Sequence, residues 1–181
     1  MIVTKNLLTH TLAHYQTPYP EENSFTNQFL TLLEHPRCFH RDHLPGHLTG
    51  SAWIVDQSLQ SVLLTHHAKL NKWLQPGGHA DGDENIFAVA LREAEEETGL
   101  RKFTLLREAI FDIDIHTIPQ RKDFPEHLHF DIRFLFQTDQ QEPLLITEES
   151  HDLKWFPLHD LEKITTNQSM LRMRNKSLSL L

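Results

Sequence analysis

The sequence predicts an α/β fold, and three observations support this prediction. Strand-like segments occupy 48–66 and return between 111 and 134, where apolar and polar residues alternate. One segment between them has apolar residues at the three- and four-residue spacing of a helix. The first 40 residues have a helical pattern of their own. With 181 residues, 39% of them hydrophobic, the chain can bury a sizeable core as one domain with an extension.

The N-terminal part, residues 1–40, predicts two helices. A weak apolar stripe that starts at Leu7 marks the first, which Pro18–Pro20 ends. The second runs from Glu21 to Glu34 with one apolar face, and Pro36 stops it. We therefore expect an N-terminal helical extension over 1–40, a central domain over 41–165, and a C-terminal helix or tail over 166–181.

The first strands of the central domain form a predicted hairpin. Leu48–Asp56 is one strand, residues 57–59 make the turn, and Gln60–His66 is the returning strand. A short extended piece follows at Trp73–Gln75. Pro76-Gly77-Gly78 then gives a strong turn signal.

The predicted helix after this turn lies in the most acidic segment of the chain. Its apolar stripe consists of Phe87, Ala90, Leu91 and Ala94. Gly99 suits the left-handed position just after a helix end. The segment 78–100 holds seven acidic residues against one arginine, which gives −6 of the chain's −8. Because like charges three or four apart destabilise a helix, this pattern indicates a cation that offsets them.

Two later strands, Phe111–His116 and His127–Phe134, alternate cleanly between an apolar and a polar face. The polar faces are formed by Asp112, Asp114, His116, His127, His129, Asp131 and Arg133. These faces either meet water or line a substrate pocket. A loop separates the two strands, and a last short strand over 153–156 precedes a short helix. Residues 167–176 are predicted to be helical.

Composition excludes several classes of protein. Cys38 is the single cysteine, so no internal disulfide is expected. Residues 1–16 do not have the pattern of a signal peptide, and no apolar run approaches the roughly 18 residues that span a membrane. The net acidic charge argues against nucleic-acid binding. We expect a cytoplasmic protein with no membrane or nucleic-acid partner.

Three glutamates of the acidic helix form a candidate metal site. Glu93, Glu96 and Glu97 have the i, i+3, i+4 spacing that places side chains on one helix face. Magnesium prefers such oxygen ligands and retains waters and substrate phosphates. Gly77 and Gly78 can bring backbone close to the same metal or to a phosphate. The alternative for an acidic helix face is simple solvation.

The acidic segment resembles the Nudix box, which is glycine, five residues, glutamate, seven residues, then Arg-Glu-apolar-x-Glu-Glu-x-Gly-apolar. The matching residues are Gly78, Glu84, Arg92, Glu93, Ala94, Glu96, Glu97, Gly99 and Leu100. Ala94 is the softest match, because the family often has a larger aliphatic residue there. The box covers 23 of the 181 residues.

This resemblance implies a fold and a reaction. Nudix proteins share an α/β/α sandwich with a mixed, partly closed sheet. Most hydrolyse a nucleoside diphosphate linked to another group, with Mg²⁺ or Mn²⁺. The resemblance makes Glu93, Glu96 and Glu97 the metal ligands and catalytic acids, and the carbonyl of Gly77 or Gly78 a further ligand. Conserved partners in the box, here Glu84, Arg92 and Gly99, would hold its loop and helix in place.

Residues outside the box are assigned less directly. A further acid in this family often comes from a later loop, so Glu148 and Glu149 are the first candidates and Asp131 is the second. For the substrate itself, a small nucleoside diphosphate derivative, the candidate contacts are Asp114, His127, His129, Asp131 and Arg133. Of these, His129 and Arg133 are expected to touch phosphate or ribose. The His-Leu-His-x-Asp order of 127–131 also allows a zinc site.

Three functions remain open from the sequence. The first is a metal-dependent pyrophosphohydrolase. The second is an isomerase of allylic diphosphates, but Cys38 lies far from the box, in the extension. The third is a nucleotide-binding module without catalysis, although such modules usually lose box carboxylates. The sequence does not select a substrate, and a homodimer is possible.

Overall fold

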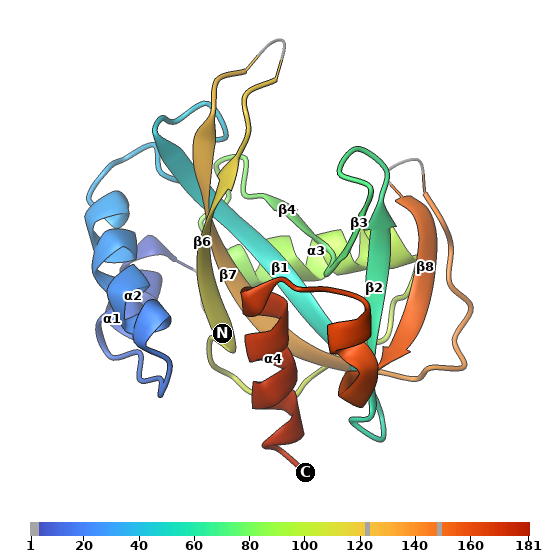
Figure 1. The fold of residues 1–181 in the computed structure, drawn as a ribbon. Coiled ribbons are helices and arrows are strands. Elements are labelled where there is room, and N and C mark those ends of the chain that lie inside the picture. The colour runs from blue at the N-terminus through green and yellow to red at the C-terminus, as the bar shows by residue number, and fades with distance from the viewer. Residues whose placement is uncertain (1–3, 122–123, 148–149) are drawn as a thin grey trace.

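The computed structural model describes residues 4–121, 124–147 and 150–181 and shows one mixed sheet with helices on both faces (Figure 1). Its helices are α1 (Lys5–Ala13), α2 (Pro20–Leu33), α3 (Ile86–Thr98) and α4 (Gln168–Leu178), with a 3₁₀ helix at Leu158–Lys163. The first strands are β1 (Gly46–Asp56), β2 (Ser61–His67), β3 (Lys72–Leu74) and β4 (Gly77–His79). The later strands are β5 (Thr104–Leu105), β6 (Asp112–Ile118), β7 (His127–Thr138) and β8 (Ser150–Pro157).

Strand β1 is the centre of the sheet. It runs parallel to β7 along its whole length, with Gly46 opposite Leu128 and Asp56 opposite Thr138. Its other edge pairs with two strands in turn, antiparallel β4 near its start and antiparallel β2 near its end. Every residue of β1 is buried, as expected for a strand covered on both faces. The outer pairs are β2 with β8 and β6 with β7.

Two apolar cores lie on opposite faces of the sheet. Leu48, Ala52 and Ile54 of β1 face the first core, to which α1, α2 and α3 contribute. Trp53 and Val55 face the second, which is closed by the 3₁₀ helix and α4. This alternation follows from the two-residue period of a strand. Near the start of β1 the second face is polar instead, with buried His47, Thr49 and Ser51.

Sequence signals explain the helix boundaries. Pro20 occupies the first turn of α2, where its missing N–H costs no hydrogen bond. The side chain of Asn85 accepts from the Ala88 N–H at 3.1 Å and caps α3. Gly99 ends α3 with φ at 75°, the left-handed conformation predicted for it. No helix in the described parts of the chain has the length and apolarity to cross a membrane.

The α/β class and the mixed sheet are confirmed, one local prediction was wrong, and one alternative that the sequence left open is now decided for its central residues. The segment 76–78 was expected to be a turn, but Gly77–His79 forms β4 beside β1. Glycine makes this close pairing possible, because a Cβ on Gly77 would collide with the side chain of Ser51. The polar face of β6 and β7 does not meet water at its centre, where Asp112, Asp131 and Arg133 are all buried.

Candidate functional site

The acidic face of α3 lies against β4. Glu97 is buried, and its carboxylate accepts the backbone N–H of Gly77 at 2.8 Å. Glu93 is largely buried and accepts from the Arg92 guanidinium at 2.7 Å. Glu96 is 63% exposed at its side chain, with Arg92 only 3.9 Å away. We call the group formed by Gly77, Gly78, Glu93, Glu96 and Glu97 the acidic junction.

Gly78 fixes the spacing of this junction. A Cβ added at Gly78 would lie 2.5 Å from the carboxylate carbon of Glu93 and 2.6–2.7 Å from its oxygens. Only glycine therefore lets β4 run this close to the carboxylates of α3. The backbone of β4 thus lies directly against the carboxylate side chains of α3.

The acidic junction fits a hard divalent cation by its chemistry. All its side-chain donors are carboxylate oxygens, the ligands that Mg²⁺ and Mn²⁺ accept. Among the described residues, oxygen atoms of these three carboxylates do not all lie within 4.8 Å of one another, whereas ring nitrogens of His47, His127 and His129 do. Like charges repel without a cation between them, and exposed Glu96 has room to turn towards its neighbours.

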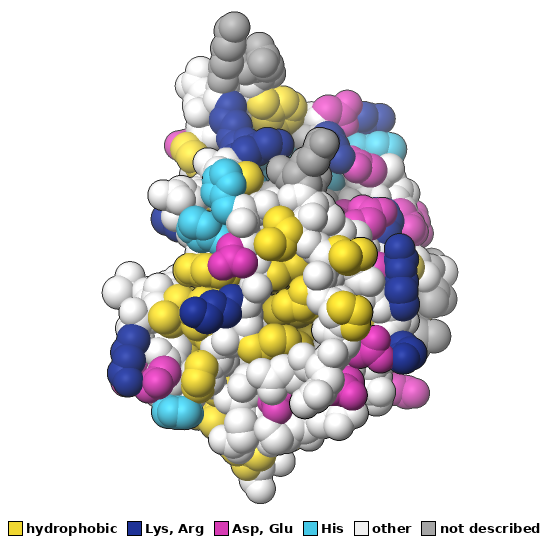
Figure 2. Space-filling view, turned by 90° about the vertical axis from the view of Figure 1, so that its right-hand side faces the viewer, with side chains coloured by type: hydrophobic (Ala, Val, Ile, Leu, Met, Phe, Trp, Pro, Cys, Tyr) yellow, Lys and Arg dark blue, Asp and Glu magenta, His cyan; other side chains and the backbone are white. Residues whose placement is uncertain are grey.

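On the face of the molecule seen in Figure 2, several Asp and Glu side chains gather along one edge, mixed with Lys, Arg and His. Arg92 is one of the compensating cations, since it contacts both Glu93 and Glu96. It also donates to the carbonyl of His79 at 3.0 Å, which ties α3 to β4. Glu84 makes a different link, because it accepts the backbone N–H of Lys5 at 3.0 Å and so joins the box to α1.

Arg133 does not face an open site. It is buried, and each of its three guanidinium nitrogens donates to a different aspartate. Those partners are Asp131 at 2.7 Å, Asp112 at 3.1 Å and Asp114 at 3.2 Å. The expected contact between Arg133 and a substrate phosphate is therefore unsupported by its geometry, and its contacts indicate a structural role instead.

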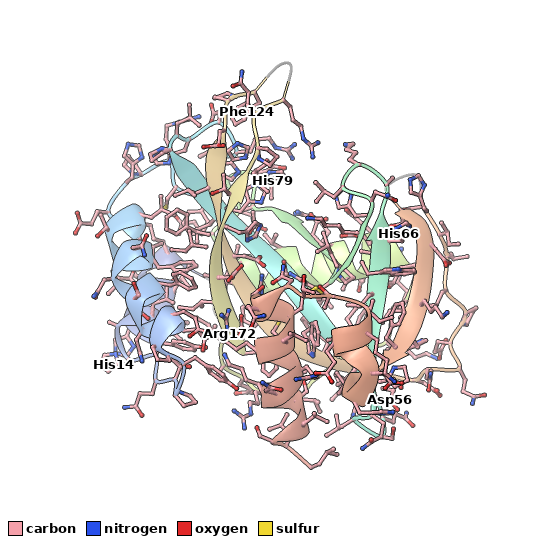
Figure 3. All side chains as sticks on the ribbon, viewed as in Figure 1. His14, Asp56, His66, His79, Phe124 and Arg172 are labelled. Carbon is pink, nitrogen blue, oxygen red and sulfur yellow. The ribbon has the colours of Figure 1, made fainter. Side chains whose placement is uncertain are left out.

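Helix α4 supplies a second buried cation to the same network. Arg172 enters from α4 towards β6 (Figure 3) and donates to both oxygens of Asp112 at 2.8 Å. Lys176 of the same helix contacts Glu22 at 2.6 Å and Asp112 at 2.9 Å. Burial alone would raise the pKa of Asp112, but the hydrogen bonds from Arg172 and the charges of Arg133 and Lys176 hold it below its usual range.

Sequence reasoning missed Arg172, Lys176 and Glu22. They lie in the terminal helices, which the sequence assigned to parts outside the central domain. Within each helix they follow an ordinary polar pattern, so no local signal identifies a buried ion pair. Only the polar residues of the strand at Asp112 and Asp114 indicated that charged partners were needed.

Asp131 is held by several donors. It accepts from the hydroxyls of Thr49 at 3.0 Å and Ser51 at 2.7 Å, in addition to Arg133 and Gln75. Through the hydrogen bonds from Thr49 and Ser51, Asp131 connects β7 with β1. Glu148 and Glu149, the first candidates for the further acid, lie outside the described residues.

A cavity of about 520 Å³ opens between α2, β6 and the start of α4. Its wall consists of Glu21, Phe25, Asp114, His116, Asn167, Gln168, Ser169 and Arg172. Asp114 is thus the predicted substrate residue that borders an open space. The glutamates of the acidic junction do not line this cavity.

His127 and His129 lie together on β7, at the other end of the same sheet face. His127 is buried and His129 is partly buried, and their Nε2 atoms are 3.3 Å apart. They adjoin His47 of β1 rather than Arg133. The predicted site residues therefore separate into the acidic junction, the aspartate–arginine network and this histidine group.

The model of the NUDIX domain matches residues 47–175, well over half of the chain. The chain belongs to the Nudix family. Among curated Nudix relatives, it is similar to a probable DHNTP pyrophosphohydrolase of Lactococcus lactis, at 29% identity over 97 residues, which are 52% of this chain and 56% of that protein. An m7GpppN-mRNA hydrolase of Xenopus laevis is 42% identical over 57 residues, 29% of this chain and 19% of the relative. The chain thus spans only part of the length of both relatives.

Solved Nudix structures share the fold. The Ap4A hydrolase of C. elegans, in a binary complex, superposes with a TM-score of 0.60 at 20% identity, over 74% of this chain and 96% of that one. A NUDIX family hydrolase from Clostridium perfringens gives a TM-score of 0.56 at 28% identity, over 75% and 98% of the two chains. The expected Nudix fold, a curled mixed sheet flanked by helices, is therefore confirmed.

Proposed function

We propose that this Nudix protein hydrolyses the pyrophosphate bond of a nucleoside diphosphate linked to another group, with Mg²⁺ or Mn²⁺. One observation carries the proposal. The three box glutamates are all present, and Gly77 and Gly78 bring β4 against two of them. Glu97 is buried beside β4, where its carboxylate accepts the N–H of Gly77, and burial of such a charge is favourable only when charges or hydrogen bonds compensate it.

The residues of the acidic junction would have different roles in the reaction. Glu93, Glu96 and Glu97 would hold the cation, together with a carbonyl of Gly77 or Gly78. Such a cation neutralises diphosphate charge and lowers the pKa of a bound water. Arg92 would keep Glu93 and Glu96 oriented through the contacts already described. A nearby carboxylate would accept the proton of the attacking water, and Glu149 is our candidate beside the box glutamates.

The substrate class rests on relatives. Those similar to this chain include a bis(5'-nucleosyl)-tetraphosphatase of Rattus norvegicus and the proteins named above. A Nudix domain of Shewanella oneidensis NrtR, similar in fold, was solved with ADP ribose. We therefore propose a small nucleotide with a phosphoric anhydride. Asp114, which borders the 520 Å³ cavity, is the proposed contact to it. A cytoplasmic location and a homodimer stay predictions.

A turnover screen tests this function. The protein is incubated with Mg²⁺ or Mn²⁺ and a panel that includes dinucleoside polyphosphates, ADP-ribose and nucleoside triphosphates, and released phosphate products are separated by chromatography. We expect cleavage of at least one compound that stops when the metal is chelated and that Glu96→Gln reduces. Binding of nucleotides without cleavage of any would favour the noncatalytic module instead.

A further inference from the structure

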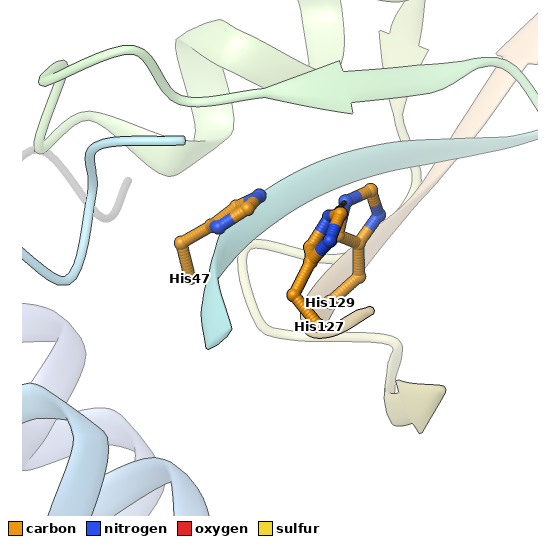
Figure 4. Close-up of side chains that lie close together, drawn as sticks. All are labelled: His47, His127 and His129. Carbon is orange, nitrogen blue, oxygen red and sulfur yellow. Dashed lines mark hydrogen bonds between the residues drawn. The ribbon is translucent and has the colours of Figure 1, made fainter. Parts of the chain in front are cut away.

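Three histidines turn their ring nitrogens towards one point on the sheet. One nitrogen each from His47, His127 and His129 lies within 4.8 Å of the other two. The parallel register explains the grouping, because His47 of β1 stands opposite His129 of β7. His127 precedes His129 by two residues and so shares its face. Figure 4 shows His47 on β1 with the other two rings side by side.

The backbone fixes the tautomers of two of these rings. Nδ1 of His47 lies 3.3 Å from the carbonyl oxygen of His43, and Nδ1 of His127 lies 2.9 Å from that of Pro125. A carbonyl only accepts, so both Nδ1 atoms carry the proton and both Nε2 atoms carry a lone pair, of which that on His127 accepts from Nε2 of His129. A histidine that binds a metal is commonly oriented by this same contact from its other nitrogen to a carbonyl.

The Nε2 atom of His47 has no hydrogen-bond partner among the described residues, although it is buried and its residue is 1% exposed. Leaving a buried polar atom unpaired is unfavourable, which indicates a missing partner. The Nε2 atoms of His127 and His129 are 3.3 Å apart. Two imidazoles bound tetrahedrally to zinc at about 2.0–2.1 Å would stand about 3.3–3.4 Å apart, so this pair already has the spacing of ligands.

The surroundings of His47 and His129 favour the neutral ring, which is the form that binds metal. Burial lowers the pKa of His47 to about 4. Burial, and then the neighbouring histidines His79 and His116, hold the pKa of His129 well below its usual range.

We propose that His47, His127 and His129 form a binding site for a transition-metal ion of the zinc class. Such ions accept imidazole nitrogen, whereas Mg²⁺ prefers the oxygen donors of the acidic junction. Three protein ligands leave one coordination position for water or a ligand oxygen. The site adjoins β4, since the ring of His79 is centred 5.2 Å from His47 and 4.9 Å from His129.

Zinc binding can be measured without substrate. Metal-free, reduced protein is titrated with Zn²⁺ against a chromophoric chelator in excess Mg²⁺. We expect about one tight site per chain, and His47→Gln and His129→Gln should each weaken it more than about tenfold, because even loss of an orienting partner costs about 10–100-fold. His14→Gln is the matched control, since His10 and His14 stack on α1 at 4.4 Å and offer a competing surface pair. It should keep the tight site.

A spectroscopic measurement on the wild-type protein tests the zinc site even if a variant does not fold. Long-range ¹⁵N–¹H spectra of the histidine rings are recorded with and without one equivalent of Zn²⁺. Coordination should move the Nε2 resonances of His47, His127 and His129, with Nδ1 protonated in all three. Unchanged resonances for these rings would overturn the proposal. So would folded His47→Gln protein that binds Zn²⁺ as the wild type does, or tight binding lost only in His14→Gln.

Discussion

Gly78 places the backbone of β4 directly beside Glu93, one of the proposed metal ligands. Its missing side chain leaves the space that the Glu93 carboxylate fills, 2.5 Å from where a Cβ would be. The sequence identified this glycine through its box spacing. It did not predict that β4 would pair with β1, because a Pro-Gly-Gly run is also typical of a turn.

Gly78→Ala should therefore lower activity more than stability. The new methyl group would push Glu93 aside by about an ångström, and a misplacement of that size can cost about 100-fold in rate. Glu93 is a flexible side chain, so the free energy of unfolding should change by less than about 1 kcal/mol. Steady-state kinetics and urea denaturation of the same protein check both parts. Wild-type kcat/KM in a folded Gly78→Ala protein would contradict this role of Gly78.

Helix α4 shows how an element distant in sequence completes the sheet. Its Arg172 is buried against Asp112, and its Met170 and Met173 belong to the second apolar core. The sequence predicted a helix here but no partner for it. Side chains that pair 60 residues apart, such as Arg172 and Asp112, leave no periodic signal, so this part of the fold could not be derived from the pattern.

Arg172→Ala should destabilise the protein strongly. Removal of one partner leaves Asp112 and Glu22 charged and buried, which typically costs about 3–5 kcal/mol. Arg174→Ala on the same helix is the control, because its partner Glu162 is 64% exposed, and loss of a surface pair costs less than about 1 kcal/mol. Urea denaturation gives both values. If both variants lost the same small free energy of unfolding, the buried network would contribute little to stability.

At the scale of the whole molecule, the buried network links stability to acid pH. Burial acts to raise the pKa of Asp112 and Asp114, but the arginine contacts prevail and lower both. A carboxyl whose pKa is lower in the folded state contributes stability above its unfolded pKa of about 3.9, and this stability is lost as pH falls through the folded value.

We therefore expect the thermal midpoint to fall steeply below about pH 4, where the unfolded chain takes up these protons first. Asp112→Asn should have a lower midpoint at neutral pH and a flatter decline in acid, because one titrating group is gone. Calorimetry across this range measures both. A decline of equal slope in the two proteins would mean that Asp112 does not contribute to the acid sensitivity.

Much of the fold could be predicted from the sequence, and there are physical reasons why the rest could not. The box helix, its glycine end and the alternating strands were predicted because local periodicity sets them. The sequence did not reveal that Arg133 is occupied by aspartates or that His47 joins His127 and His129. The first depends on the antiparallel pairing of β6 with β7, which places Asp112 opposite Arg133. The second depends on the parallel pairing of β1 with β7, which brings together residues about 80 positions apart.

If the acidic junction supports metal-dependent hydrolysis, loss of one of its carboxylates must slow the reaction far more than loss of a carboxylate elsewhere on α3. The rate of Mg²⁺-dependent product release is measured for the wild type, Glu97→Gln and Glu95→Gln, with a substrate found in the screen. Glu95 lies on the same helix but pairs with Arg101 at 2.8 Å outside the junction. Glu97→Gln should lower kcat by about 100-fold or more, whereas Glu95→Gln should stay near the wild type. Equal rates for a folded Glu97→Gln protein and the wild type would contradict the claim.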